Sequence, residues 1–450
     1  MNQLVEIRTF GRGGIHPDPH KRPTAELPIE VLPTPAEVWL PLSQHIGEPA
    51  VPIVKKGDRV VRGQKIAEGG ANGVSIHATI AGKVKPLDKR PHPTLVMAES
   101  IAIKAEGEQE QLPFDEDKDW RTLPSADALD RIREAGIVGL GGAAFPTYKK
   151  LVPRPGTVLE TLILNGAECE PYLTSDYRLM LAEPEAIVEG AIAMARLVGV
   201  RRVLVGIEAD KMEAVAALRK AAHGIPMDDF TFIVIPCEVR YPQGAERQLV
   251  AALTGREIPL RALPSSVGVL VQNVATAHAV HHALRYRRPL LDRIVTVSGP
   301  GVVHPRNVRV PIGTMLQAIV DFCGGLLPET TRIIAGGPMM GRALPRLDLP
   351  LIKGMNGLLL LTGQGPFENG YEPCVSCVRC IEACPLGLEP DQVSIRVEAG
   401  KTLDTGPYGA RECYECGCCT YVCPSGRPLL QFMQMAKSAL RRASDVRGQA

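Results

Sequence analysis

The chain has 450 residues, which at ~150 residues per domain is enough for about three domains with buried cores. Its 51 Lys and Arg residues nearly balance its 49 Asp and Glu residues, so nucleic-acid binding is not expected. Hydrophobic residues make up 45% of the chain, which excludes a disordered protein, while 44 glycines and 39 prolines predict many turns and loops.

The apolar runs of the sequence are short. The longest, 357–362 and 267–271, fall below the ~20 residues needed to cross a bilayer. The first residues contain no apolar segment with a cleavage site, so a signal peptide is not expected. We therefore predict a cytoplasmic chain without a membrane span, and in such a reducing compartment spaced cysteines indicate metal binding rather than disulfides.

Residues 1 to about 120 contain short apolar alternations between glycine turns, which predict a small β domain. Segments 57–67, 74–78 and 81–84 resemble the barrel-sandwich fold of lipoyl and biotinyl carriers. Those carriers present a modified lysine on the hairpin between their two halves. The corresponding segment 68–73 contains no lysine, so a covalently attached swinging arm is not expected.

A glycine-rich loop follows a predicted helix at 126–135. It combines glycines with a hydroxyl and two ammonium groups, contributed by Gly139, Gly141, Gly142, Thr147, Lys149 and Lys150. Glycines let backbone N–H groups approach a phosphate, and a lysine can neutralise it. Because the loop follows a helix rather than a strand, it does not satisfy the dinucleotide-binding fingerprint, and a glycine turn that packs sheet against helix is the alternative.

Residues 125–255 alternate short buried strands with amphipathic helices. Strands are predicted at 161–165, 202–207 and 230–236, and helices at 184–197, 211–222 and 245–253. This order predicts a mostly parallel sheet with helices on both faces. Ligands of such sheets bind at the carboxyl ends of the strands, so loops 165–168 and 241–244 are candidate walls of a site.

Isolated histidines in the first two thirds of the chain invite two interpretations each. His278, His281 and His282 have helical spacing, and without acidic ligands close in sequence they favour a helix surface over a metal site. His16 and His20, with Lys21, fit either a docking patch for a partner or a solvated strand end. Further along, residues 290–365 predict a small α+β domain of short strands punctuated by glycines.

Eight of the twelve cysteines form two runs with the same C-x2-C-x2-C-x3-C-P spacing. This spacing is typical of bacterial ferredoxins, in which the fourth cysteine of each run binds the cluster of the other run. We therefore predict two [4Fe-4S] clusters, one held by Cys374, Cys377, Cys380 and Cys423 and the other by Cys413, Cys416, Cys419 and Cys384. Zinc sites are the alternative, but two complete identical runs favour iron–sulfur clusters.

The remaining cysteines are predicted to be structural. Cys418 is a spare residue beside the second run, and Cys169, Cys237 and Cys323 are expected to be buried apolar side chains. Residues after Gln431 predict a basic amphipathic helix with a solvated charged face. Clusters that carry single electrons beside a nucleotide pocket require a carrier that splits a hydride, and a flavin can do this.

Three ordered segments resemble the flavin-binding part of the NADH-binding flavoprotein subunit of respiratory complex I. They are the loop 139–147, the Asn-Gly-Ala-Glu-Cys-Glu-Pro segment 165–171 and the Gln-Asn-Val-Ala-Thr segment 272–276. The segment 9–17, the Gly-Gly-Pro-Met-Met-Gly run 336–341 and the paired cysteine runs extend the likeness over nearly the whole chain. This combination is similar to the RnfC family, the peripheral subunits of Rnf-type ion-translocating ferredoxin:NAD oxidoreductases.

The resemblance implies a multidomain α/β and α+β protein. Its expected domains are a barrel-sandwich hybrid at 1–120, a complex I flavoprotein-like α/β domain for FMN and NADH at 121–288, a β-grasp domain of the SLBB type at 289–365, and a ferredoxin domain with two [4Fe-4S] clusters and a C-terminal helix at 366–450.

The resemblance also implies positions for FMN and NAD(H). Gly141, Gly142 and Lys149 or Lys150 would hold the FMN phosphate, Asn165 and Asn273 would contact the flavin, Glu170 and Phe145 would lie by the nicotinamide nucleotide, and Gly139, Glu168, Glu246 and Thr276 complete the predicted cofactor-binding set. Ala167 and Ala245 stand where complex I has acidic residues.

The implied function is an electron-input module. NADH would reduce FMN, and the flavin would pass single electrons through two clusters to membrane and iron–sulfur subunits of the complex, with ferredoxin or flavodoxin as an indirect partner and no nucleic acid. The chain would bind peripherally at the cytoplasmic face of the bacterial inner membrane. The alternatives are a soluble NADH-dependent reductase of the cobalamin-reductase type, or a non-catalytic electron-relay adaptor.

Overall fold

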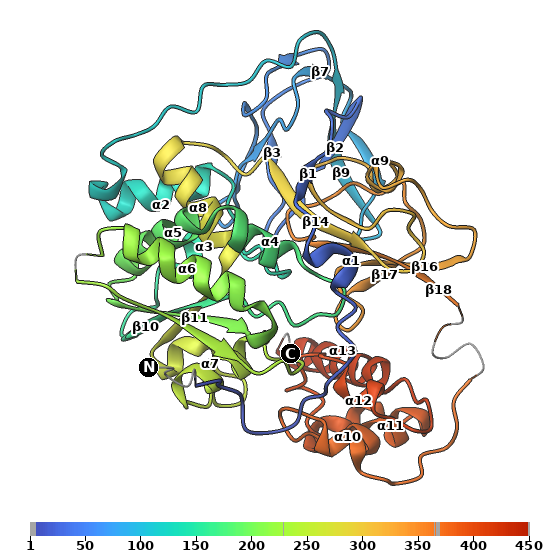
Figure 1. The fold of residues 1–450 in the computed structure, drawn as a ribbon. Helices are drawn as coiled ribbons and strands as arrows, with labels where there is room; N and C mark the ends of the chain where they lie inside the picture. The colour runs from blue at the N-terminus through green and yellow to red at the C-terminus, as the bar shows by residue number, and fades with distance from the viewer. Residues whose placement is uncertain (1–5, 228, 364, 366–369, 449–450) are drawn as a thin grey trace.

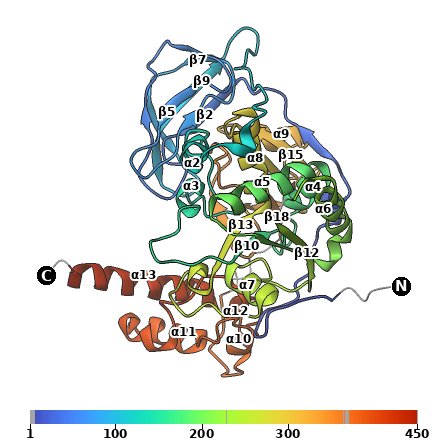
Figure 2. The ribbon, with the colours of Figure 1, turned by 90° about the vertical axis from the view of Figure 1, so that its left-hand side faces the viewer.

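The computed structural model describes residues 6–448 except residues 228, 364 and 366–369. Three sheet-containing regions and a cysteine-rich helical region surround a central cleft. In both views the barrel sheets lie at the top of the molecule and the cysteine-rich helices at the bottom (Figures 1 and 2). The α/β sheet and the mixed sheet lie between them.

The predicted N-terminal β domain is confirmed as two small sheets facing one another. One contains β2 (Glu37–Pro41), β9 (Met97–Ala105), β7 (Gly82–Val84) and β4 (Arg59–Val60), with β8 (Asp88–Pro91) also paired to β9; the other contains β3 (Val51–Pro52), β5 (Lys65–Glu68) and β6 (Ile76–His77). Val38, Ile66 and Ile103 are fully buried between them, as alternating strands with one apolar face require. The hairpin at 68–73 contacts the next domain, because Lys149 Nζ donates a hydrogen bond to Asn72 Oδ1.

The second region is a four-stranded parallel sheet, as predicted. Its strand order is β12 (Thr231–Cys237), β11 (Arg202–Glu208), β10 (Thr161–Asn165) and β13 (Val269–Asn273), and every pairing is parallel. Strand β10 is buried on both faces: Leu162 and Leu164 belong to one hydrophobic cluster and Ile163 to another. Continuous apolar strands of this kind are expected where helices cover both faces of a parallel sheet.

Helices cover both faces of this sheet. They are α2 (Ser125–Glu134), α3 (Thr147–Lys150), α4 (Ser175–Ala182), α5 (Pro184–Leu197), α6 (Met212–Gly224), α7 (Glu246–Thr254) and α8 (Val274–Tyr286), with 3-10 turns at Trp120–Thr122, Ala209–Lys211 and Pro264–Val267. Helix α5 matches its predicted bounds, and α6 and α7 differ by one or two residues. Helices α4 and α8 were not predicted.

The third region is a six-stranded mixed sheet. Its order is β1 (Ile29–Val31), β15 (Arg306–Pro311), β14 (Asp292–Ser298), β18 (Gly357–Thr362), β16 (Thr330–Ala335) and β17 (Arg342–Leu344), packed against α9 (Leu316–Phe322). Residues 29–31 therefore lie outside the barrel sheets, although they fall within the range predicted for the barrel domain. They form a parallel edge strand on β15, and the short helix α1 (Arg22–Ala25) precedes them.

The C-terminal region consists of short helices and cysteine-bearing loops. Its elements are α10 (Arg379–Glu382), α11 (Pro390–Glu398), a 3-10 segment at Thr402–Tyr408, α12 (Cys418–Tyr421) and α13 (Leu429–Gly448). The predicted helix after Gln431 corresponds to α13, which begins two residues earlier. The predicted domain start at residue 366 falls on residues 366–369, outside the described residues.

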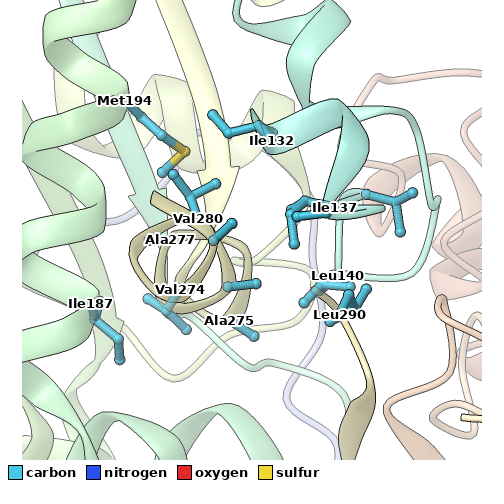
Figure 3. Close-up of a cluster of buried hydrophobic side chains, with 14 of the residues drawn as sticks. Ile132, Ile137, Leu140, Ile187, Met194, Val274, Ala275, Ala277, Val280 and Leu290 are labelled. Carbon is cyan, nitrogen blue, oxygen red and sulfur yellow. The ribbon is translucent and has the colours of Figure 1, made fainter. Parts of the chain in front are cut away.

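Buried side chains join α8 to its neighbours and fix the glycine-rich loop. Val274, Ala277 and Val280 of α8 pack between α5 and the segment that carries Ile137 and Leu140 (Figure 3). The Leu140 amide donates a hydrogen bond to Thr276 Oγ1 (2.9 Å), and its carbonyl accepts one from the buried Arg293 guanidinium (3.0 Å). The loop that follows Leu140 therefore starts from a rigid position in the core.

The crossing of α5 and α8 yields a stability prediction. A Cβ at Gly190 would lie 1.9 Å from the Ala277 carbonyl oxygen, which is backbone and cannot move aside. We expect Gly190→Ala to lower the free energy of unfolding by about 2–3 kcal/mol, as overpacking does. Gly224→Ala is the matched control, because a Cβ there meets open space. Chemical denaturation of both variants measures the difference, and equal stabilities would contradict the helix contact.

Candidate functional site

A cavity of about 780 Å³ lies at the carboxyl ends of β10 and β13. All three sheet-containing regions contribute to its wall. Six of the predicted cofactor-binding residues line it: Gly141, Gly142, Asn165, Glu168, Glu170 and Asn273. The predicted wall loops also take their expected places, since Ala167, Tyr241, Pro242 and Gly244 line the same cavity. Its volume lies in the upper part of the range of small-molecule sites.

The other six predicted residues do not line this cavity. Lys150 Nζ is 2.8 Å from Glu246 Oε1, so these two side chains pair with each other, and Lys149 bonds the barrel hairpin at Asn72. Thr276 accepts the Leu140 amide, as described above. Gly139 donates its N–H to the Phe145 carbonyl (2.8 Å), which closes the loop, and the Phe145 side chain is 38% exposed. These residues shape the loop from outside the cavity.

The glycine-rich loop presents bare backbone to the cavity. Gly142 has φ +120°, a conformation that favours glycine, and a Cβ built there meets no atom within 4 Å. The Ala144 amide turns back to the Gly139 carbonyl (3.2 Å), and the Ala144 carbonyl accepts the Ile46 amide of the barrel domain (3.2 Å). The loop is thus held at both ends while its glycines face open space.

Two asparagines fix the strand ends that border the cavity. Asn165 donates from Nδ2 to the Gly244 carbonyl (2.7 Å) and accepts the Ala167 amide. Asn273 caps α8 by accepting the Ala275 amide at Oδ1 (2.8 Å) and donates from Nδ2 to Asp176 Oδ2 (2.6 Å). Each amide keeps one unused N–H, because an NH2 group carries two donors.

Carboxyl groups in the wall have unusual environments. Glu168 accepts hydrogen bonds from the Ser175 hydroxyl and from the Asp176 and Tyr177 amides, so it caps the start of α4. Burial, together with the neighbouring Glu168 charge, raises the pKa of Asp176 to about 7. Asp176 is therefore able to hold a proton at neutral pH beside the cavity.

Glu170 joins the α/β domain to the mixed sheet. Its carboxylate accepts the backbone N–H groups of Met339 (3.0 Å) and Met340 (2.8 Å), and a Cβ at Gly337 would overlap it. Burial raises the pKa of Glu170 to about 7, against the opposing effect of those two amides. Only glycine at position 337 leaves room for this contact. The Gly-Gly-Pro-Met-Met-Gly run is thereby held at the cavity wall.

One side of the cavity contacts the cysteine-rich region directly. The Tyr241 hydroxyl donates to the Cys416 carbonyl (2.8 Å), and Tyr241, Cys416 and Cys418 share one hydrophobic cluster with Cys169 at its edge. Cys169 lines the cavity and accepts the Gly244 amide at Sγ (3.2 Å), so its interpretation as an isolated core residue was wrong. Cys237, Cys323 and Cys418 are buried as predicted.

The eight predicted ligand cysteines fall into two groups. Cys374, Cys377, Cys380 and Cys423 line one small cavity of about 20 Å³, although Cys423 comes from the other run. Around the second group, burial raises the pKa of Cys419, and the nearby Cys416, Cys413 and Cys384 thiolates raise it further. The fold thus brings together the residues of each crossed set.

Both cysteine runs wrap with the same backbone geometry. The residues two and four positions after the first cysteine have positive φ in each run: Ser376 (52°) and Val378 (56°), then Glu415 (67°) and Gly417 (81°). The amides of Ser376 and Glu415 donate to the sulfur atoms of Cys374 and Cys413 at 3.4 and 3.3 Å. A β-branched valine at positive φ is unfavourable, so the surrounding loop must impose this conformation.

The spacing of the sulfur atoms distinguishes the two kinds of metal centre. Tetrahedral zinc with bonds of ~2.3 Å would bring its sulfur ligands within ~3.8 Å of one another. In the described part of the chain, no three cysteine sulfurs lie within 4.8 Å of one another; the one group of metal-binding residue types that close is Glu183, His278 and His282. Wider nests suit a cubane, whose four thiolates bind four separate irons.

The histidines of α8 are not on a helix surface, so that prediction was wrong. His278 and His281 are buried, and His278 and His282 point their Nε2 atoms at Glu183 Oε2 (2.7 and 3.3 Å). Burial lowers the pKa of His278 to about 4, and the hydrogen bonds from both histidines lower the pKa of Glu183. The acidic partner was missed because it lies 95 residues from His278 in sequence.

Glu183 also ties the α/β domain to the mixed sheet. Its Oε1 atom accepts a hydrogen bond from Arg309 (2.6 Å), which in turn lies 3.3 Å from Asp292. His281 Nε2 lies 2.7 Å from Glu189 Oε2. These histidines therefore belong to a network of buried polar contacts between domains, which burial favours only when every member has a partner.

The N-terminal charges do not form a patch. Lys21 is buried, donates to the Glu168 carbonyl and lies 3.7 Å from Glu208 Oε2, while His20 stacks on Tyr172. His16 Nδ1 lies 3.0 Å from the Val239 carbonyl. This segment supports the Glu168 loop from behind.

Family comparisons agree with this arrangement. Residues 9–108 match the RnfC barrel sandwich hybrid domain, residues 132–282 match the Nuo51 FMN-binding domain, and residues 294–343 match the SLBB domain. The predicted fold class is thereby confirmed: the chain combines a barrel-sandwich hybrid with a complex I-type flavin domain and an SLBB domain.

Curated relatives cover most of the chain. It is 43% identical over 391 residues to the RnfC-type subunit of the proton-translocating ferredoxin:NAD(+) oxidoreductase complex of Clostridium ljungdahlii, covering 86% of this chain and 84% of that protein. It is 43% identical to the equivalent subunit of the ion-translocating oxidoreductase complex of Rhodobacter capsulatus, covering 95% and 83%. The equivalent subunit of the Na(+)-translocating ferredoxin:NAD(+) oxidoreductase complex of Acetobacterium woodii is 41% identical, covering 86% of each. The chain belongs to the RnfC family of subunits of ion-translocating oxidoreductase complexes.

A solved structure shares part of the fold. A chain of an NAD+-reducing [NiFe]-hydrogenase in the air-oxidized state superposes with a TM-score of 0.50 at 21% identity, over 70% of this chain and 63% of that one. At this identity the likeness concerns the fold alone.

The raised pKa of Glu170 predicts a pH dependence of stability. Because folding raises this pKa from 4.5 to about 7, the stabilisation is complete below pH ~4.5 and is lost as the pH rises through ~7. Relative to Glu170→Gln, which does not ionise, the wild type should lose up to ~3 kcal/mol over this range. Urea unfolding midpoints of both proteins at several pH values measure this. Parallel curves would show that Glu170 ionises normally.

Proposed function

We propose that this chain exchanges electrons between NADH and the rest of an ion-translocating ferredoxin:NAD oxidoreductase complex, through FMN in the central cavity and two [4Fe-4S] clusters. The observation that carries the proposal is the contact between the cavity and the cysteine loops. Tyr241 lines the cavity and bonds the Cys416 carbonyl, so a group in the cavity and a group held by Cys416 would be near neighbours. Family membership supports the same assignment.

The cavity residues fit a flavin mononucleotide. The open backbone at Gly141 and Gly142 would hold the phosphate, since a side chain at position 142 would project into the free space. Helices α4, α7 and α8 all begin at the cavity, next to Asp176, Ala245 and Asn273, and helix N-termini favour an anion. Asn165 and Asn273 would contact the flavin through their unused N–H groups, with Glu168 and Glu170 beside it.

FMN, when bound, accepts a hydride and releases electrons one at a time. The chain's own groups hold the accompanying proton: Asp176 and Glu170 both line the cavity and both have a pKa raised to about 7. Cys169 remains a neutral thiol because burial raises its pKa, so it serves as a packing contact toward the cysteine loops rather than as a nucleophile.

The two cysteine nests define an order of electron carriers. The nest with Cys416 contacts Tyr241 and would receive electrons from the cavity first. The nest of Cys374, Cys377, Cys380 and Cys423 contains the exposed Cys377 and would pass them outward. Its receivers would be iron–sulfur and membrane subunits of the complex, with ferredoxin reached indirectly.

Attachment to the membrane would rest on those partners. No helix among the described residues combines the length and apolar character that a bilayer span requires. We infer that the chain sits peripherally on the cytoplasmic face, held by protein contacts.

Reduction by NADH tests the flavin assignment. Anaerobic addition of NADH to the chain reconstituted with FMN should bleach the flavin absorbance and then reduce the clusters. Asn273→Leu removes the cap of α8 and the bond to Asp176, and should lower flavin retention. Gln317→Leu, on α9 away from the cavity, is the control. A chain that binds clusters but no flavin would instead be an electron relay.

Paired cysteine variants test the crossed ligand sets. Cys374→Ser combined with Cys423→Ser should disable one cluster and leave about four of about eight irons. Cys374→Ser combined with Cys384→Ser should disable both clusters. Iron and sulfide analysis with EPR of the reduced proteins measures this. The opposite pattern would mean that each run binds its own cluster.

A further inference from the structure

The cavity contains a positive charge that the sequence prediction did not include. The lysines expected to bind phosphate, Lys149 and Lys150, bond Asn72 and Glu246 instead and do not line the cavity. Among the residues that do line it, Arg342 is the one lysine or arginine. It belongs to strand β17 of the SLBB sheet, outside the α/β domain.

Arg342 sits where the SLBB sheet meets the barrel domain. Its Nη1 atom donates to the Thr94 carbonyl, which fixes the side chain against barrel residues that also line the cavity. Within the described part of the chain the guanidinium has no carboxylate partner. An exposed arginine that is oriented by a carbonyl but not neutralised retains its full affinity for an anion.

Apolar side chains surround this arginine. Ile46 and Leu95 of the barrel domain and Met340 of the SLBB domain line the cavity and are 57%, 49% and 53% exposed. His92 cannot add charge easily, because its Nδ1 atom accepts the Thr94 and Leu95 amides and burial lowers its pKa. A lone guanidinium with exposed apolar neighbours suits a ligand that carries both phosphate and a flat base.

We propose that the barrel and SLBB domains together form the subsite for the ADP moiety of the nicotinamide dinucleotide, with Arg342 binding its diphosphate and Ile46, Leu95 and Met340 contacting the adenosine. This inference rests on the proposed function and adds to it the part of the site that selects the nucleotide. The barrel domain thereby acquires a role in substrate binding.

Position in the molecule favours the dinucleotide over the FMN phosphate as the source of this anion. The barrel domain lies at the opposite end of the molecule from the cysteine-rich region (Figures 1 and 2). The flavin ring must lie on the side of Tyr241 and Cys169, which contact the cysteine loops. The wall farthest from the clusters is left for the part of the substrate that takes no part in electron transfer.

ADP-ribose, which lacks the nicotinamide ring, probes this subsite without any redox step. Its dissociation constant should be measured by titration calorimetry on the full chain loaded with FMN and clusters. We expect Arg342→Gln to weaken ADP-ribose binding about tenfold or more and to leave FMN content unchanged, whereas Arg342→Lys keeps part of the affinity. Arg346→Gln is the matched control: Arg346 is exposed, pairs with Asp348 and does not line the cavity.

A second variant separates shape from charge. Leu95→Asp should also weaken ADP-ribose binding, because a carboxylate beside the diphosphate would repel it. In steady-state assays both variants should raise KM for NADH while kcat stays within about twofold, since the bound redox groups are untouched.

Three results would overturn the inference. Unchanged ADP-ribose binding in Arg342→Gln would remove the role of this residue, and loss of FMN with unchanged ADP-ribose binding would assign Arg342 to the flavin phosphate. If NADH bleached the flavin of the wild type but ADP-ribose did not bind, the subsite would be wrong and the proposed function would stand. A wild type that neither binds ADP-ribose nor responds to NADH would overturn both.

Discussion

The contact between Tyr241 and the Cys416 loop is the constraint on which the arrangement depends. Tyr241 follows the end of β12, so the parallel sheet positions it, and its hydroxyl fixes the carbonyl of a predicted ligand. The N-terminal segment reinforces the contact: Ile15 pairs with Tyr241, and the neighbouring Gly14 amide bonds the Ala383 carbonyl. The cavity and the cysteine loops therefore cannot separate without breaking a packed cluster of side chains.

Glycines and buried polar contacts hold the other boundaries of the cavity. Gly337 admits Glu170, and Glu183 with His278 and Arg309 joins the α/β domain to the SLBB sheet. Each of these contacts places a polar or charged group between domains, where it is favourable only if its partners stay in register. Domain orientation is thus specified by hydrogen-bond geometry as well as by apolar packing, as suits a site assembled from three domains.

Local patterns predicted much of this fold, and their failures have a common cause. The strand at 161–165 and the helix at 184–197 were predicted with the observed bounds, because apolar periodicity depends on nearby residues. The partners of Lys149, Lys150 and His278 come from distant segments, and no periodicity reports such contacts. Arg342 escaped notice for the same reason: nothing around it in sequence distinguishes it from the exposed Arg346 four residues later.

The edge strand β1 has a consequence for how the chain matures. Ile29 pairs with Asn307, about 280 residues further along, with the barrel and α/β domains between them. During synthesis, the first thirty residues must wait for most of the chain to leave the ribosome before they find their place. Since the same segment braces the cysteine loops, their final geometry would form late, after the flavin domain has folded, and that order would favour cluster insertion as a closing step of assembly.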